Sequence, residues 1–249
     1  MKKLHLFVFA GLLACHAVAV ANDGLTDMEI ANAEKLRDQA KQGSNAYAIV
    51  ESLTTEIGPR MGGSEEYDRA TAWAQEKFKQ LGYDKVWLQP VTFPVWQRRA
   101  ESGRVISPYP QPLALTALGG STGTGGPLVA EVVEFASLDA LKAAADGSLN
   151  GKIAFVNQKM VRAKDGSGYG PVSTLRRTGA SEAASKGAVA FVIRSVGTDS
   201  DRLPHTGMMR YEDGIAKIPA AALSVPDADL LANMQKRGKP VKNELNNDA

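Results

Sequence analysis

The chain has very few of the residues that perform most enzyme chemistry: among 249 residues there is one cysteine, Cys15, and there are three histidines. A single cysteine cannot form an intramolecular disulfide. His5, His16 and Cys15 all fall within the first 21 residues, so removal of that segment leaves His205 alone. Because a zinc site needs several imidazole, thiolate or carboxylate ligands at suitable spacing, we predict no metal-binding residue in the mature chain.

The sequence also has no large excess of positive or negative charge. The sequence has 29 basic and 27 acidic residues, and loss of Lys2 and Lys3 would lower the basic count to 27, equal to the acidic count. No basic stripe is left that would favour nucleic acid or an anionic membrane as a partner. With 44% hydrophobic and 22% charged residues, the composition is typical of a globular protein of one or two domains.

The apolar run at the N-terminus, residues 4–13, is too short to cross a bilayer as a helix. It follows two lysines and precedes a small-residue cleavage site at residues 19–21, which is the pattern of a signal peptide. We predict cleavage after residue 21 and a secreted or periplasmic protein. The alternative is a lipoprotein anchored through Cys15, because residues 12–15 resemble the box at which bacterial lipoproteins are cut and lipidated.

Three amphipathic helices are predicted in the first third of the mature chain, over residues 27–42, 45–57 and 65–81. Residues 86–93 are rich in β-formers and predict the first strand of a sheet, with Pro90 favouring an edge or a bulge. The helix starts are signalled by Thr26 with Glu29, Ser44 and Ser64, and the stops by Gly43, Gly58 and Gly82.

The sequence changes in character after Arg99. A segment rich in proline and glycine, residues 108–126, predicts a boundary and its connecting loops. Short apolar strands then alternate with helices, and the strand, helix, strand order predicts parallel crossovers in an α/β fold. The predicted strands are 128–135, 152–157, 188–194, 218–224 and 241–245, and the predicted helices are 173–186 and 225–237, the second with capping-box spacing between Ser224 and Asp227.

Two glycine-rich stretches resemble nucleotide-binding loops only superficially. Residues 119–126 lack the Lys and hydroxyl that hold the outer phosphates and their magnesium. In residues 165–170 the glycines have the wrong spacing for a dinucleotide fingerprint. We predict both to be loops. His205 has no neighbours at ligand spacing, and a structural or contact role in a loop is favoured for it.

A family resemblance covers the mature chain. The stretch "TEIGPRMGGSEEYDRATAWAQEKFKQLGYDKVWLQPVTFPVWQR" (55–98) resembles the start of secreted two-zinc exopeptidases of the carboxypeptidase Q (plasma glutamate carboxypeptidase) type. Residues 101–245 resemble the protease-associated domain inserted in that family, most closely in "TGASEAASKGAVAFVIRS" and "HTGMMRY…KIPAAALSVPDADLL". The resemblance implies an α/β fold in which 22–100 form the helices and first strand of an incomplete peptidase domain, 101–245 the insert, and 246–249 a tail.

The family's zinc ligands and catalytic carboxylates follow the insert, and none has a counterpart in this chain. The resemblance therefore implies the front portion of a zinc exopeptidase that acts on dipeptides or peptides, inactive alone and binding neither of the family's two zinc ions. It also makes His205 and Arg210 candidates for contact with the substrate. The alternative is a non-enzymatic module that binds peptides or proteins. Such a module should close its final strand, whereas we expect residues 241–245 to fray.

Overall fold

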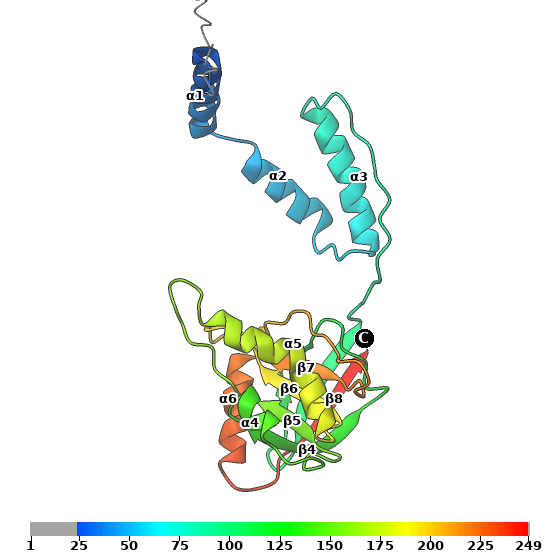
Figure 1. Ribbon diagram of the computed structural model, residues 1–249. Helices are drawn as coiled ribbons and strands as arrows, with labels where there is room; N and C mark the ends of the chain where they lie inside the picture. Colours follow the sequence, from blue (N-terminus) through cyan, green and yellow to red (C-terminus); the bar gives the residue numbers. More distant parts are fainter. Residues whose placement is uncertain (1–23, 249) are drawn as a thin grey trace, which may run out of the picture. The chain divides into compact units, whose positions relative to one another are not determined.

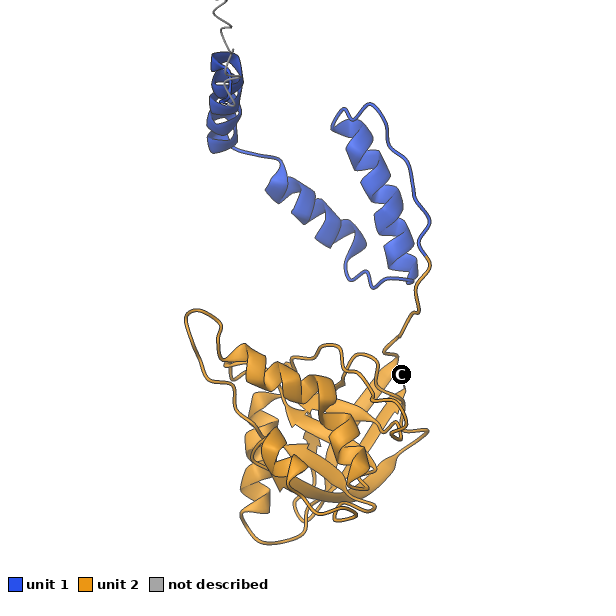
Figure 2. Cartoon of the chain, in the orientation of Figure 1, with its two compact units in different colours: residues 1–91 blue, residues 92–249 orange. Residues whose placement is uncertain are grey.

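The computed structural model describes residues 24–248. The predicted signal segment, with Cys15 as the alternative lipidation site, and residue 249 lie outside this range. The chain divides into two compact units, residues 1–91 and residues 92–249, shown in separate colours in Figure 2. Each unit is described by itself.

Unit 1 contains the three predicted helices, α1 (Asp27–Gln42), α2 (Ala46–Ser52) and α3 (Glu65–Gln80), and a π-helical turn, η1 (Leu53–Ile57), extends α2. The capping box of α1 is confirmed, since Thr26 Oγ1 accepts from the Glu29 N–H and Glu29 accepts from the Thr26 N–H at 2.7 Å. The cap of α3 is confirmed as well, with Ser64 Oγ accepting from the Tyr67 N–H at 3.2 Å. The cap predicted for α2 differs: its N-cap is Asn45, which makes no side-chain cap hydrogen bond, and Ser44 Oγ accepts from the Ala46 N–H at 3.3 Å.

The helices of unit 1 have apolar faces that remain exposed. A hydrogen bond of 2.9 Å from Trp73 Nε1 to Ser52 Oγ joins α3 to α2, yet none of the described residues of unit 1 is buried. The large apolar side chains left exposed on the helices include Ile30, Leu36, Tyr47, Val50, Tyr67 and Phe78. Amphipathic helices gain most of their stability from burial of such faces, so these helices are only weakly supported within unit 1.

The prediction of a strand at residues 86–93 is wrong, because these residues form no strand in the structure. Residues 84–99 are irregular, and Trp87 is 69% exposed. A strand exists only through hydrogen bonds to a neighbouring strand, and within residues 24–248 no strand pairs with this segment. Pro90 and Pro94 also lack the N–H groups that pairing uses. β-Propensity alone therefore did not suffice here.

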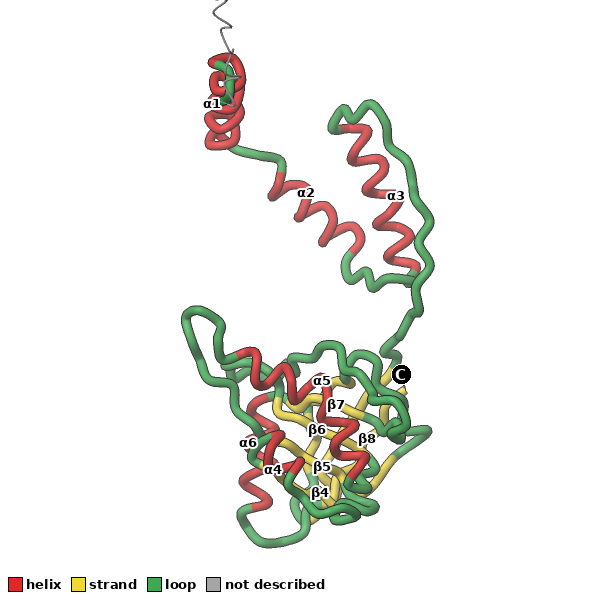
Figure 3. Tube along the Cα trace, in the orientation of Figure 1, coloured by secondary structure: helices red, strands yellow, loops and turns green. Residues whose placement is uncertain are grey.

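Unit 2 is an α/β unit built on one eight-stranded sheet with the order β2-β1-β8-β4-β5-β6-β7-β3. Strands β4 to β8 of this sheet are labelled in Figures 1 and 3. Strands β4, β5, β6 and β7 run parallel, which confirms the predicted parallel crossovers. The elements are β1 (Ala100–Ser107), β2 (Gln111–Leu113), β3 (Leu115–Ala117), β4 (Leu128–Phe135), α4 (Leu138–Lys142), β5 (Ile153–Val156), α5 (Tyr169–Ser185), β6 (Ala190–Arg194), β7 (Ala220–Leu223), α6 (Val225–Gln235) and β8 (Lys242–Asp248).

The sheet curls so that its two edge strands meet at one residue. Strand β2 pairs with β1 at one end of the order, β3 pairs with β7 at the other, and only Ala114 separates β2 from β3. The start of α6 holds this corner, because Ala114 O accepts from the Ser224 N–H at 2.9 Å and the Ala114 N–H donates to Asp227 Oδ2 at 2.7 Å. The sheet thereby leaves little free edge.

Strands β5 and β6 are buried on both faces, as the apolar run at 188–194 predicted. Phe191 and Ile193 of β6 face the cluster that includes α4 and α5, and Val192 faces the cluster inside the curl that includes α6. Alternate side chains of one strand therefore serve two cores. Figure 1 shows α5 lying across one face of the sheet.

Two further predictions need correction. The segment expected to be boundary and loops contains β2 and β3, and β1 precedes them; helix α4 was not predicted either. The last strand does not fray at Leu245 but continues to Asp248, into the residues 246–249 predicted as a tail. It is hydrogen bonded on both sides, to β1 with Ala100 opposite Asp248, and to β4.

Candidate functional site

Polar side chains meet at the carboxyl ends of the parallel strands. Arg194, the last residue of β6, is only 4% exposed; it donates to Asn157 Oδ1 at 2.7 Å and to Asp229 of α6. Asn157 Nδ2 in turn donates to Glu134 Oε1 at 2.7 Å. Ligands of open α/β sheets bind at this edge. Here the guanidinium is already occupied by protein groups, so the network supports the sheet rather than presenting free donors.

The Asp229 carboxylate of this network stays ionised at neutral pH. Burial alone would raise the pKa of Asp229, but the hydrogen bond and positive charge of Arg194, together with Lys159 at 3.7 Å, outweigh burial and lower it. A carboxylate with a lowered pKa is a poor general acid near neutral pH.

The two residues predicted to contact substrate lie on the loop between β6 and β7. The His205 N–H donates to Ser195 Oγ at 2.9 Å, and the Arg210 N–H donates to Arg177 O of α5 at 3.0 Å. Both side chains are exposed, and neither makes a hydrogen bond or salt bridge with another described residue. The structure thus attaches His205 to the end of β6 and Arg210 to α5; their contact with substrate stays a prediction.

The same loop packs against the glycine-rich segment 119–126, which is a loop as predicted. The Gly119 N–H donates to Gly207 O at 2.9 Å, and Tyr211 Oη accepts from the Thr122 N–H at 2.9 Å. Burial raises the pKa of the Tyr211 hydroxyl, so it is neutral at physiological pH and serves as a hydrogen-bonding bridge.

Arg176 of α5 is a further candidate, which was not predicted from the sequence. Its Nη2 donates to Tyr169 Oη at 3.0 Å, its guanidinium carbon lies 5.7 Å from the centre of the Tyr169 ring, and its Nη1 lies 3.4 Å from Thr206 O. Its Nε is buried and has no hydrogen-bond partner. A signal was available: Arg176 and Arg177 have no acidic residue three or four positions away on the helix.

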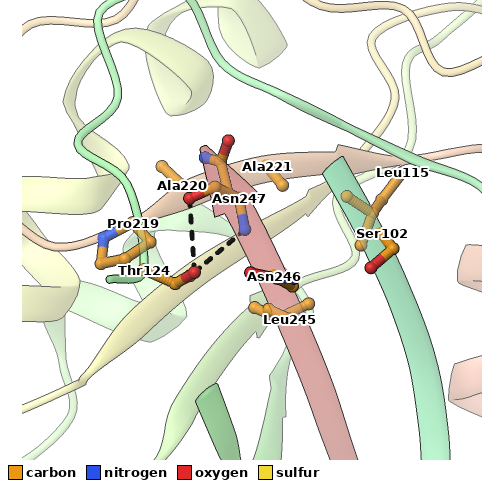
Figure 4. Close-up of a pocket in the computed structure, with 9 residues that line it drawn as sticks. All are labelled: Ser102, Leu115, Thr124, Pro219, Ala220, Ala221, Leu245, Asn246 and Asn247. Carbon is orange, nitrogen blue, oxygen red and sulfur yellow. Dashed lines mark hydrogen bonds between the residues drawn. The ribbon is translucent and has the colours of Figure 1, made fainter. Parts of the chain in front are cut away.

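A small pocket lies where β1 and β8 approach β3 and β7 (Figure 4). Thr124 Oγ1 accepts from the Asn247 N–H at 2.9 Å, and the side-chain amide of Asn247, 6% exposed, has no hydrogen bond to any described residue. The pocket volume of about 10 Å³ is far below the roughly 300–1,000 Å³ of most ligand pockets. Its lining is Ser102, Leu115, Thr124, Pro219, Ala220, Ala221, Leu245, Asn246 and Asn247.

A wider groove of about 500 Å³ runs beside β1 and β2. Its one charged lining residue, Arg104, is engaged by Glu244 through two hydrogen bonds of 2.9 Å. The groove therefore offers no free group for acid, base or nucleophilic chemistry. It is lined by Arg104, Val105, Ile106, Pro110, Gln111 and Pro112.

Residues 24–248 contain no group of three or more His, Cys, Asp or Glu side chains that could hold a metal ion. Over the same range, no helix combines the length and the hydropathy needed to cross a membrane.

Comparison with known proteins identifies the relatives of this chain. No family model matches it. Carboxypeptidase Q of Mus musculus is 36% identical over 221 residues, covering 86% of this chain and 46% of the relative. Carboxypeptidase Q of Homo sapiens is 36% identical over 199 residues, covering 80% and 41%. The crystal structure of a peptidase M28 precursor from Shewanella amazonensis is 51% identical with a TM-score of 0.82, covering 89% of this chain and 50% of that one.

The zinc aminopeptidase BSAP from Bacillus subtilis shares the fold alone, with 20% identity and a TM-score of 0.55 over 82% of this chain and 43% of that one. The fold is thus α/β and matches half of the M28 peptidase structure. The chain is a carboxypeptidase Q homologue, which confirms the resemblance seen in the sequence. It spans about half the length of the curated relatives it matches.

Proposed function

We propose that this chain is the front portion of a secreted zinc metallo-exopeptidase of the carboxypeptidase Q type, which in its complete form hydrolyses dipeptides or short peptides. Unit 1 contributes scaffold to the peptidase domain, and unit 2 is the protease-associated domain. The observation that carries the proposal is the similarity itself, which covers 86% of the chain against mouse carboxypeptidase Q and 89% against the Shewanella peptidase. The predicted signal segment supports export.

The exposed helix faces of unit 1 support a scaffold role. Tyr67 and Phe78 lie on one face of α3, and both are exposed. Contiguous apolar surface of this kind marks a place where another part of a protein packs. In the complete protein, we propose that the central sheet of the peptidase domain covers these faces.

The described residues do not fit the family's two-zinc site. A two-metal centre needs converging imidazoles and carboxylates, but His205 is exposed and belongs to no metal-binding group within residues 24–248. We therefore assign no catalytic step to this chain. We propose that the zinc ligands lie in the half of the family's proteins that this chain does not span.

A chimera tests the proposal. The matching half of the Shewanella peptidase is replaced by this chain, and zinc-dependent hydrolysis of neutral dipeptides is measured. We expect an active enzyme, because the two sequences are 51% identical over the exchanged part. The chain alone, dialysed and then supplied with zinc, should neither retain the metal in stoichiometric amounts nor hydrolyse dipeptides. Dipeptidase activity that copurifies with the chain and responds to zinc would falsify the second expectation.

Two variants of the chimera test the scaffold role. Phe78→Asp places a charge on the apolar face of α3 and should abolish activity, because a buried charge prevents docking. Ala72→Asp introduces the same residue at an exposed position on the opposite side of the helix and should leave activity nearly unchanged. Equal activity of the two variants would contradict the scaffold role.

A second candidate function is a peptide- or protein-binding module without enzymatic activity. One observation favours it: the edge strands of the sheet in unit 2 meet at Ala114, and β8 does not fray as we expected, since it is paired with β4 through Leu245 and with β1 through Asp248. The binding module would be favoured over the peptidase if the chimera folds but is inactive while the chain alone binds peptides.

A further inference from the structure

The segment that leads into β1 is attached to unit 2 by its side chains. Trp96 Nε1 donates to Ser121 O at 2.8 Å, and Arg98 Nη2 donates to Ala117 O at 2.8 Å. Both acceptors lie on β3 or on the loop that follows it, although the strands hydrogen bonded to β1 are β2 and β8. Residues 96–98 are therefore attached to the opposite end of the strand order.

Arg98 and Glu101 together occupy the free edge of β3. Next to Ala117, the Leu118 N–H donates to Ala220 O of β7 at 2.9 Å, and successive residues of a strand direct their backbone groups to opposite edges, so the groups of Ala117 point away from β7. There the Ala117 N–H donates to Glu101 Oε2 at 2.6 Å, and Ala117 O accepts from Arg98. The two side chains thus take the place of a neighbouring strand.

Arg98 is also held by its own neighbours in the sequence. Its Nε lies 3.4 Å from Glu101 Oε2, and its Cζ lies 5.2 Å from the centre of the Trp96 ring. The side chains of Arg98 and Glu101 are 34% and 17% exposed, so salt screens this ion pair less than a fully exposed one. A guanidinium over an indole ring is a favourable cation–π arrangement. The three side chains therefore support one another as well as β3.

The preceding residues have no such attachment. Within the described chain, residues 84–95 make no hydrogen bond and no salt bridge. The side chains of Leu88, Val91 and Val95 are 58%, 74% and 48% exposed. Backbone with few hydrogen bonds and few buried contacts moves most readily. The change from free to attached chain thus falls between Val95 and Trp96.

We propose that Trp96, Arg98 and Glu101 form a clasp that determines where the connection between the two units bends. The clasp attaches the chain to β3 from Trp96 onward, so bending is confined to residues 84–95. In the proposed peptidase, unit 1 belongs to the peptidase domain and unit 2 is its insert. The clasp then limits the movement of the insert relative to the peptidase domain, a consequence that rests on the proposed function.

NMR relaxation of backbone ¹⁵N nuclei in the full chain tests the clasp. In the parent, the N–H groups of residues 96–98 should have order parameters of about 0.85, as in a rigid backbone, and those of residues 84–95 should lie below about 0.6. Arg98→Met removes the donors but keeps an unbranched side chain, and it should lower the order parameters of residues 96–98 to below about 0.6.

Arg99→Gln is the matched control and should leave these order parameters unchanged. Arg99 is the next residue along the chain, and within the described residues its guanidinium pairs only with Asp248, at 3.5 Å, with 67% of the side chain exposed. An exposed pair of this kind contributes little. Arg98→Lys keeps the charge but loses the planar fork, and it should fall between the parent and Arg98→Met.

Order parameters below about 0.6 for residues 96–98 of the parent would overturn the clasp, and so would unchanged values in Arg98→Met. Trp96→Phe keeps a ring but loses the N–H that donates to Ser121 O, and it should lower the order parameters less than Arg98→Met does. If Arg98→Met does not fold, unchanged order parameters in Trp96→Phe would overturn the clasp instead.

The chimera with the Shewanella peptidase tests the consequence for activity. Arg98→Met should lower its kcat/KM for dipeptides by about 2- to 30-fold, the range of mutations that change coupling between parts of a protein, whereas Arg99→Gln should not. Equal kcat/KM of the two variants would overturn this consequence. A folded but inactive chimera, with residues 96–98 rigid in the chain, rejects the proposed peptidase function alone. An active chimera, with residues 96–98 flexible in the chain, rejects the clasp alone.

Discussion

Replacement of Gly179 by alanine sets two known effects against each other inside α5. Alanine is favoured over glycine in a helix interior by about 1 kcal/mol. The new Cβ, however, would lie 2.9 and 3.0 Å from Cε1 and Cε2 of Phe191 and closer still to Cζ. Phe191 is 0% exposed and belongs to the larger core, so its ring cannot move into solvent. Overpacking of this kind costs about 1–3 kcal/mol, and at the upper end it outweighs the gain. We expect Gly179→Ala to destabilise unit 2 by about 1–2 kcal/mol.

Urea denaturation measures this effect, with Trp96 as the probe because its indole N–H donates to Ser121 O of unit 2 at 2.8 Å. Gly170→Ala, in the first turn of the same helix and with no atom within 4 Å of the added Cβ, is the control and should be neutral or stabilising by up to about 1 kcal/mol. Phe191→Leu removes the ring atoms that clash, so the double variant with Gly179→Ala should lose less stability than the sum of the two single changes. A Gly179→Ala protein as stable as the parent would refute the reasoning.

Three other predictions concern stability. Limited proteolysis should remove the residues before about 100 first and leave a resistant core beginning near Glu101, because no described residue of unit 1 is buried. Uniform resistance of the whole chain, with a single cooperative thermal transition, would contradict this prediction. The lowered pKa of Asp229 means that its stabilising effect is present above its unfolded pKa and lost as the pH falls through the folded one. Urea titrations at pH 7 and pH 3 should therefore show a smaller pH dependence for Asp229→Asn than for the parent. Asp227→Ala leaves the Ala114 N–H without its acceptor and should lower the free energy of unfolding by about 1–3 kcal/mol. A melting temperature equal to that of the parent would show that Asp227 does not stabilise the corner at Ala114.

Local signals in the sequence predicted the elements that depend on local physics. The capping box at Thr26 and Glu29 and the cap at Ser64 reappear as hydrogen bonds at the start of α1 and α3. The apolar run at 188–194 predicted a strand buried on both faces, because only such a strand dispenses with polar alternation.

Features that depend on distant partners were not predictable. Strand β3 has three residues and exists because β7, about 100 positions later, hydrogen bonds to it. Residues 86–93 have strong β-propensity but no such partner in the described chain. In the candidate site, His205 and Arg210 were identified from a resemblance. For Arg176 the sequence shows only that no acidic residue lies three or four positions away, whereas its contact with Gly207 and its unpartnered Nε depend on the fold.

The pairing of Ala100 with Asp248 determines how unit 2 responds to mechanical force. These residues begin β1 and end β8, and opposite residues of an antiparallel pair have Cα atoms only about 4.5–5.5 Å apart. Tension applied through residues 100 and 248 would pull two neighbouring strand ends apart. The hydrogen bonds between β1 and β8 would then break one after another, as in a zipper, rather than together as in shear. Unit 2 should therefore yield at low force along this direction.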